Sequence, residues 1–144
     1  MRAFMSDADN SNIEITDSHE ILEKLQEIVS QLKAIPSNQI DVPHLNNTED
    51  ELQNILPQLQ FALFNAQDEK NWEQVNKLRD AVHECKDTLN SVRAAIIRAT
   101  IIGIKPANLA EMQKILQEIK STAKTKSQID YIIYVLRFMR KLFL

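Results

Sequence analysis

Hydrophobic residues recur at alternating spacings of three and four from residue 71 to residue 102. This alternation is a heptad repeat, and a repeat sustained over such a length predicts one long helix with a continuous apolar stripe. A stripe of that kind needs partner helices, so we expect the rest of the chain to pack around it. The repeating positions are Val75, Leu78, Val82, Cys85, Leu89, Val92, Ile96 and Ala99.

The N-terminal part of the chain predicts a tail followed by a first helix. Residues 1–16 are polar and show no period, so we expect a flexible tail there. The helix is expected to begin at Asp17, because Glu20 follows three residues later as in a capping box. It runs to about Ala34. Its apolar stripe consists of Ile21, Leu25, Ile28, Leu32 and Ile35, with Leu22 and Val29 beside them.

A second helix is predicted to begin at Thr48, where Glu51 completes another capping box. Residues 36–47 before it hold two prolines and no period, so we expect a connection that could cross one end of a bundle. Pro57 interrupts the second helix, and we expect either a kink there or a true helix start just before it. The charged residues 67–70 end it. Its buried positions are expected to be Leu52, Ile55, Leu56, Leu59 and Leu63.

The end of the long helix and a fourth helix follow from the next segment. Gly103 is expected to end the long helix in the left-handed conformation, with Pro106 blocking its continuation. The β-branched run at residues 96–102 could form a strand, but no second strand candidate is evident, and we favour helix. A fourth helix is expected at about residues 107–124. Its stripe is Leu109, Met112, Leu116, Ile119 and Ala123.

The last helix is expected to run from a cap signal at Ser127 and Asp130 to the end, and it is apolar nearly all round. Such a helix must be buried on most sides. Three uses remain open: the central helix of the bundle, the interface of a dimer or of a partner's groove, and contact with an anionic membrane surface. The residues expected to bind a partner are Tyr131, Tyr134, Arg137, Phe138, Arg140, Lys141 and Phe143.

Composition supports a helical protein of one domain. The chain has 144 residues, is 44% hydrophobic and contains one glycine, whereas sheets and phosphate-binding loops normally use glycine in their turns. We therefore predict an all-α fold: an up-and-down bundle of four to five helices around the long helix at about 71–102, with residues 17–144 as a single domain.

The charge is distributed unevenly along the chain. Residues 1–104 hold 9 basic and 17 acidic residues, a balance of −8, and residues 105–144 hold 8 and 3, a balance of +5, which together give the net charge of −3. The basic part could attract acidic surfaces. Its bases can also simply solvate helix surfaces, so we expect no specific nucleic-acid binding. Besides Lys105 they are Lys114, Lys120, Lys124, Lys126, Arg137, Arg140 and Lys141.

Candidate chemistry is sparse. Cys85, the single cysteine, lies on the apolar stripe and is expected to be a buried hydrophobic residue. Asp80 and His83 have the spacing of di-metal bundle ligands, but the heptad pattern turns both outward and no second helix repeats the motif. Asp41 and His44 share the spacing but enclose a proline in an expected loop. We expect no catalytic residue, no metal site, no cofactor and no small-molecule substrate.

The pattern of apolar residues predicts neither a membrane span nor a signal peptide. No apolar run approaches the roughly 20 residues of a membrane span. The first residues lack the apolar core of a signal peptide. We therefore expect a soluble, cytoplasmic protein.

A local resemblance to a known family covers residues 59–82. The matching positions are Ala66, Asn71, Trp72, Glu73, Leu78, Arg79, Asp80 and Val82. The segment resembles the UVR motif, a helical hairpin found in excision-repair proteins and in some chaperone-associated regulators. Val75 and Asn76 stand where that family has paired alanines. The resemblance implies a hairpin at this point, with protein binding as its use.

These patterns together predict a non-enzymatic protein–protein interaction module: an adaptor, a regulator or a chaperone-like protein that acts on a protein partner or as a homo-oligomer. The expected contact surface is the C-terminal helix. The alternative is a bundle that binds or disrupts membranes through the basic and aromatic residues of the same helix.

Overall fold

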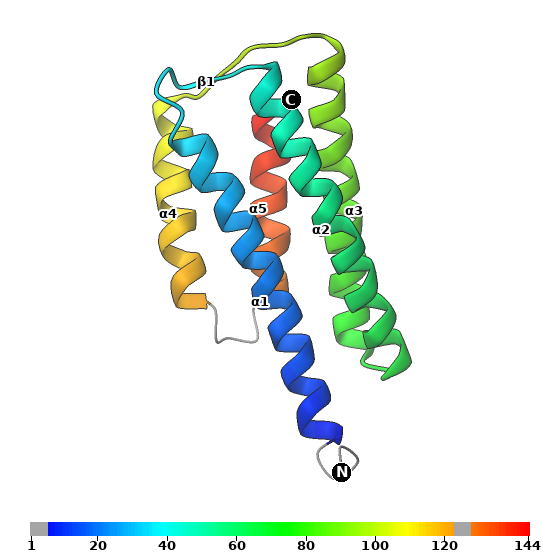
Figure 1. Ribbon diagram of the computed structural model, residues 1–144. Helices are drawn as coiled ribbons and strands as arrows, with labels where there is room; N and C mark the ends of the chain where they lie inside the picture. Colours follow the sequence, from blue (N-terminus) through cyan, green and yellow to red (C-terminus); the bar gives the residue numbers. More distant parts are fainter. Residues whose placement is uncertain (1–5, 123–127) are drawn as a thin grey trace.

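Within residues 6–122 and 128–144, which the computed structural model describes, five helices run alternately up and down (Figure 1). Side chains are described for residues 18–121 and 128–144. The helices are α1 (Ser6–Lys33), α2 (Val42–Asp68), α3 (Trp72–Ile97), α4 (Pro106–Thr122) and α5 (Gln128–Leu142), and a short strand pair joins β1 (Gln39–Ile40) to β2 (Ile102–Gly103). The predicted all-α helical bundle is confirmed.

The long helix α3 packs against α2 on one side and α5 on the other. Helix α1 contacts α2, α4 and α5, and α4 covers α1 and α5 on the side away from α3 (Figure 1). Helix α5 is therefore enclosed by α1, α3 and α4. Of the three uses left open for the C-terminal helix, this arrangement matches the central helix of the bundle.

The predicted apolar stripes form the core. Their buried members come from all five helices and are Ile21, Leu25, Ile28, Leu32, Leu52, Ile55, Leu59, Val75, Leu78, Val82, Cys85, Leu89, Val92, Met112, Ile119, Ile132 and Leu136. Leu56, Leu63, Leu109 and Leu116 are partly buried against them. Ala123 lies outside the described residues. Ala99, expected on the stripe of the long helix, lies beyond the end of α3 and is exposed. At the other described positions periodicity located the core, because each helix can bury only one face against its neighbours.

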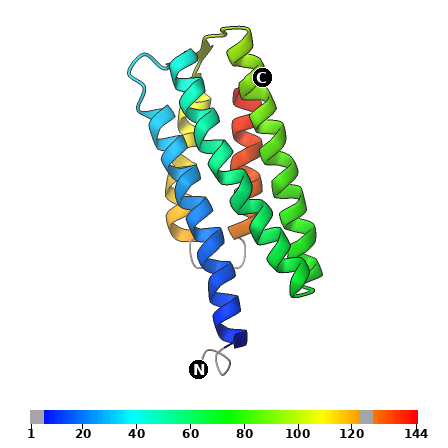
Figure 2. The same ribbon diagram turned by 45° about the vertical axis from the view of Figure 1, so that its right-hand side comes forward.

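Helix α1 begins earlier than expected. Its first residue is Ser6, so residues 6–16 are helical and the capping pattern at Asp17 does not mark a helix start. Residues 1–5 of the expected tail lie outside the described residues. The N-terminal part of α1 projects past the ends of the other helices (Figures 1 and 2), and a helix without neighbours needs no apolar stripe.

Helix α2 begins at Val42 and not at Thr48. Asp41 is its N-cap: the Oδ1 atom of Asp41 accepts a hydrogen bond from the backbone N–H of His44 at 3.3 Å, and Nδ1 of His44 accepts one from the N–H of Asp41 at 3.5 Å. Pro43 fits because proline is tolerated in the first helical turn. Residues 42–47, expected as connection, are therefore helical. The spacing of Asp41 and His44 serves helix capping.

Two residues that were expected to mark a start of the second helix, Thr48 and Pro57, lie inside α2. Thr48, the expected cap, is buried inside the helix and donates a hydrogen bond to the backbone oxygen of His44 at 3.0 Å. Pro57 lies within the continuous helix, so a helix start at that point is wrong.

Helix α3 ends earlier than expected from the sequence. The helix stops at Ile97, and Ala99, with φ of 51°, takes the left-handed conformation that was expected of Gly103. Gly103 instead pairs with Gln39 in an antiparallel register, inside the segment expected as an irregular connection. Of residues 96–102, Ile96 and Ile97 are helical and only Ile102 belongs to a strand. The partner strand β1 is only two residues long and has no period to detect. This pairing guides the chain across one end of the bundle from α3 to α4 (Figure 1).

Two further properties bear on function. Cys85 is fully buried, and burial raises the pKa of its thiol to about 12, so the nucleophilic thiolate is not formed at neutral pH. Among the described residues, no helix is long and apolar enough to cross a membrane.

Candidate interaction surfaces

Helix α5 turns most of the expected partner-binding aromatics inward. Phe143, just after α5, is only 1% exposed and so is not accessible to a partner while the bundle is folded. Tyr131 and Phe138 are half-buried, and the hydroxyl of Tyr131 donates a hydrogen bond to Oε1 of Glu118 at 2.6 Å. Burial and the Glu118 carboxylate raise the pKa of Tyr131. Tyr134 is exposed and stacks at a tilt beside Tyr131, with ring centroids 5.2 Å apart.

The two arginines of α5 are engaged with α3. Nε of Arg137 lies 2.9 Å from Oε2 of Glu84, and Nε of Arg140 lies 3.1 Å from Oε1 of the same carboxylate. Desolvation raises the pKa of Glu84, but the hydrogen bonds and charges of the two arginines outweigh it, and the net pKa is lowered. Both arginines thus hold α5 against α3. Of the seven residues expected to bind a partner, Tyr134 and Lys141 are exposed and have no ion pair with α3 among the described residues.

The sequence-based prediction missed a different set of aromatic residues. Phe61, Phe64 and Trp72 are between 58% and 63% exposed. Phe61 and Phe64 lie one turn apart on α2, off the buried stripe of that helix, and Trp72 is the first residue of α3. The signal was present in the spacing: neither phenylalanine continues the series Leu52, Ile55, Leu59.

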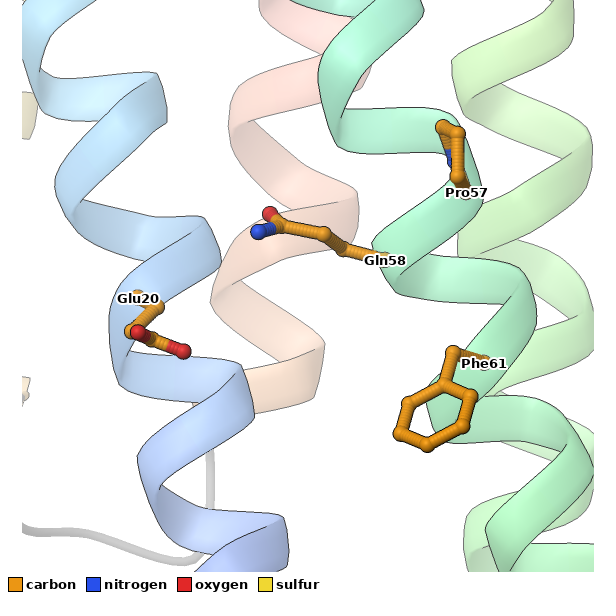
Figure 3. A pocket seen from close by; sticks show the side chains of 4 residues that line it. All are labelled: Glu20, Pro57, Gln58 and Phe61. Carbon is orange, nitrogen blue, oxygen red and sulfur yellow. The ribbon is translucent and has the colours of Figure 1, made fainter.

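Phe61 borders a cavity between α1 and α2. The cavity measures about 270 Å³ and is lined by Glu20, Pro57, Gln58 and Phe61. Figure 3 shows the Gln58 side chain reaching from α2 toward α1 and the Glu20 carboxylate turned toward α2. The Oε1 atom of Gln58 is buried and has no hydrogen-bond partner among the described residues. A buried acceptor left in this way favours a ligand that brings a hydrogen-bond donor.

The same seam between α1 and α2 carries acidic side chains toward its other end. Oε1 of Glu51 accepts a hydrogen bond from Nδ2 of Asn47 at 2.8 Å, and the same Nδ2 reaches Gln31 of α1. Desolvation by burial and the charge of Glu27 raise the pKa of Glu51, although Asn47 and Lys24 oppose this. Glu20 lines the cavity, and Glu27 and Lys24 lie close enough to Glu51 to act on its charge, so this set holds three carboxylates and one base. We call the cavity and these carboxylates together the α1–α2 groove.

The motif considered for metal binding has an ordinary surface role. Asp80 and His83 are both exposed, and Nε2 of His83 lies 3.4 Å from Oδ2 of Asp87 one turn further along α3. In the part of the chain that the structure describes, no three His, Cys, Asp or Glu side chains gather closely enough to hold a metal ion.

Comparison of the chain with protein-family models, with curated proteins and with solved structures finds no match in any of the three.

Proposed function

We propose that the protein is a non-enzymatic, cytoplasmic protein–protein interaction module, and that it binds a basic amphipathic helix of a partner in the α1–α2 groove. The proposal keeps the class of function expected from the sequence and moves the contact surface away from α5. The exposed ring of Phe61 beside a largely apolar cavity that is also lined by Glu20 is the observation that carries it.

The cavity suits one apolar side chain of a partner better than a free small molecule. Its volume of about 270 Å³ lies just below the roughly 300–1,000 Å³ of typical small-molecule sites. Phe61 and Pro57 supply an apolar wall, and an aromatic residue at the rim of a pocket is a typical anchor point at protein interfaces. A partner helix lying along the seam would bury the Phe61 ring.

The charges of the groove select the polar face of the partner. Glu20 at one end and Glu27 with Glu51 at the other favour Lys or Arg, which would also donate to Gln58. Burial and, to a smaller extent, repulsion by Glu27 raise the pKa of Glu51, and a cation next to Glu51 would offset the repulsion. Binding should therefore weaken as the pH falls and Glu51 takes up a proton, and it should weaken at high salt.

The membrane alternative would require a rearrangement of the bundle. Phe143 and the inward face of α5 belong to the core, so α5 could enter a lipid headgroup layer only after leaving α1, α3 and α4. The α1–α2 groove is accessible without any such change.

The proposal can be tested with two labelled amphipathic peptides of about 20 residues, one with leucine and lysine faces and one with leucine and glutamate faces. We expect fluorescence anisotropy to show binding of the lysine peptide only. Phe61→Gln should weaken that binding about 10–30-fold, because it removes the apolar anchor. Glu20→Gln should weaken it less, by about 3–10-fold at low salt.

Leu144→Gln is the matched control, since it also removes an exposed apolar side chain but lies at the other end of the bundle. It should leave the affinity unchanged. Equal binding of both peptides, or an affinity that Phe61→Gln does not alter, would overturn the assignment of the groove.

A further inference from the structure

The two ends of the bundle carry different exposed apolar residues. At the turn between α2 and α3 lie Phe64 and Trp72, and at the opposite end lie Ile97 and Ile101, where α3 passes into the crossing segment (Figures 1 and 2). Ile97, the last residue of α3, is 84% exposed. Leu144 lies at the same end as Ile97 and is also exposed.

The charges at the two ends are opposite. Residues 68–73, at the turn between α2 and α3, hold three acidic residues, Asp68, Glu69 and Glu73, and one basic residue, Lys70, which gives a balance of −2. Residues 97–105 at the other end hold Arg98 and Lys105 and no acid, a balance of +2. These residues are all exposed. We call Phe64, Trp72 and the three carboxylates the aromatic end, and Ile97, Ile101 and the two bases the aliphatic end.

Both ends are held in a fixed shape by the same kind of turn. At the aromatic end Lys70 has φ of 59°, and the N–H of Asn71 donates to the oxygen of Ala66 at 3.0 Å. At the aliphatic end Ala99 has φ of 51°, and the N–H of Thr100 donates to the oxygen of Ala95 at 2.9 Å. A preformed surface loses little conformational entropy on binding.

We propose that the aromatic end of one copy of this chain docks on the aliphatic end of a second copy. Each surface has what the other lacks: two aromatic rings with acidic neighbours on one, and two isoleucines with basic neighbours on the other. Charge complementarity sets the orientation, and apolar burial supplies the affinity.

This contact joins different surfaces of the two copies, so it is heterologous and leaves one free end of each kind on every dimer. Because the two ends lie at opposite poles of an elongated bundle, further copies can add in a row. Assembly should therefore grow with concentration and not stop at a dimer. The contact uses neither Phe61 nor Glu20, so it is independent of the function proposed for the α1–α2 groove.

Two half-blocked variants of the full chain test the proposal. One carries Phe64→Gln and Trp72→Gln, and the other carries Ile97→Gln and Ile101→Gln. Multi-angle light scattering should show a mass that rises with concentration for the unaltered chain, and the 16.6 kDa monomer for each variant alone. An equimolar mixture of the two variants should give a dimer and nothing larger, since only one pair of intact ends remains.

Salt provides a second readout, because screening of the opposite charges should weaken the assembly about tenfold between low and high ionic strength. Circular dichroism of each variant confirms that it is folded. A monomeric unaltered chain at all concentrations overturns the proposal. So does a mixture that stays monomeric while the unaltered chain assembles, or assembly that persists in both variants.

Discussion

Replacing Phe143 by alanine should lower the free energy of unfolding by about 3–5 kcal/mol, the usual cost of removing a buried aromatic ring. Its neighbour Leu144 should tolerate the same change with a loss below about 0.5 kcal/mol. The two residues are adjacent and both apolar, but Phe143 is 1% exposed and Leu144 is 81% exposed. The pair therefore separates burial from hydrophobicity and from position in the chain.

Urea denaturation followed by circular dichroism measures both values. A domain of this size has a total stability of roughly 5–15 kcal/mol, so Phe143→Ala should bring the transition to much lower urea or leave the chain partly unfolded. If Phe143→Ala is partly unfolded, the comparison with a folded Leu144→Ala still shows that the buried residue is the one that matters. Equal and small effects of the two substitutions would contradict the placement of α5 in the core.

Glu84→Gln should lower the free energy of unfolding by about 1–3 kcal/mol at pH 7. The Glu84 carboxylate accepts hydrogen bonds from Arg137 and Arg140, and glutamine keeps the size but removes the charge. The loss stays below that of a fully buried pair because both arginines are partly exposed and can turn to water. Glu20→Gln, the same change at an exposed site on α1, should cost less than about 0.5 kcal/mol.

The effect of Glu84→Gln should depend on pH in a defined direction. The folded state lowers the pKa of Glu84 below its ordinary value of 4.5, so the stabilisation is complete above that value and is lost as the pH falls through the lowered pKa. Urea denaturation at pH 7 and at pH 3 should show a smaller difference between the unaltered chain and Glu84→Gln at pH 3. A difference that grows toward acid pH would mean that the arginines do not stabilise this carboxylate.

The bundle could be predicted from the sequence because helix periodicity and burial share one cause. A residue such as Leu89 is buried since it lies on the only face that α3 can turn to its neighbours. Helix ends were harder, because the same residue types serve several purposes. Pro43 suggested a loop although it stands in a first helical turn, and Ala99 took the left-handed position that glycine usually occupies.

The accessible surface could be predicted only in part. The apolar character of α5 indicated burial on most sides, but it could not say whether the cover is α1, α3 and α4 or another molecule. Phe61 was overlooked because a phenylalanine next to an apolar stripe is most often part of the core. Its exposure follows from its place off the buried stripe of α2, but the cavity beside it is a tertiary feature that depends on how α1 and α2 pack.

Hydroxyl-radical footprinting of the free protein, read out residue by residue with mass spectrometry, tests most directly whether α5 is core and the α2–α3 hairpin provides the accessible aromatic surface. Phe61, Phe64 and Trp72 should be oxidised rapidly, and Phe143 should be protected. Rapid oxidation of Phe143 together with protection of Phe61 and Phe64 would contradict this account and return the binding surface to α5.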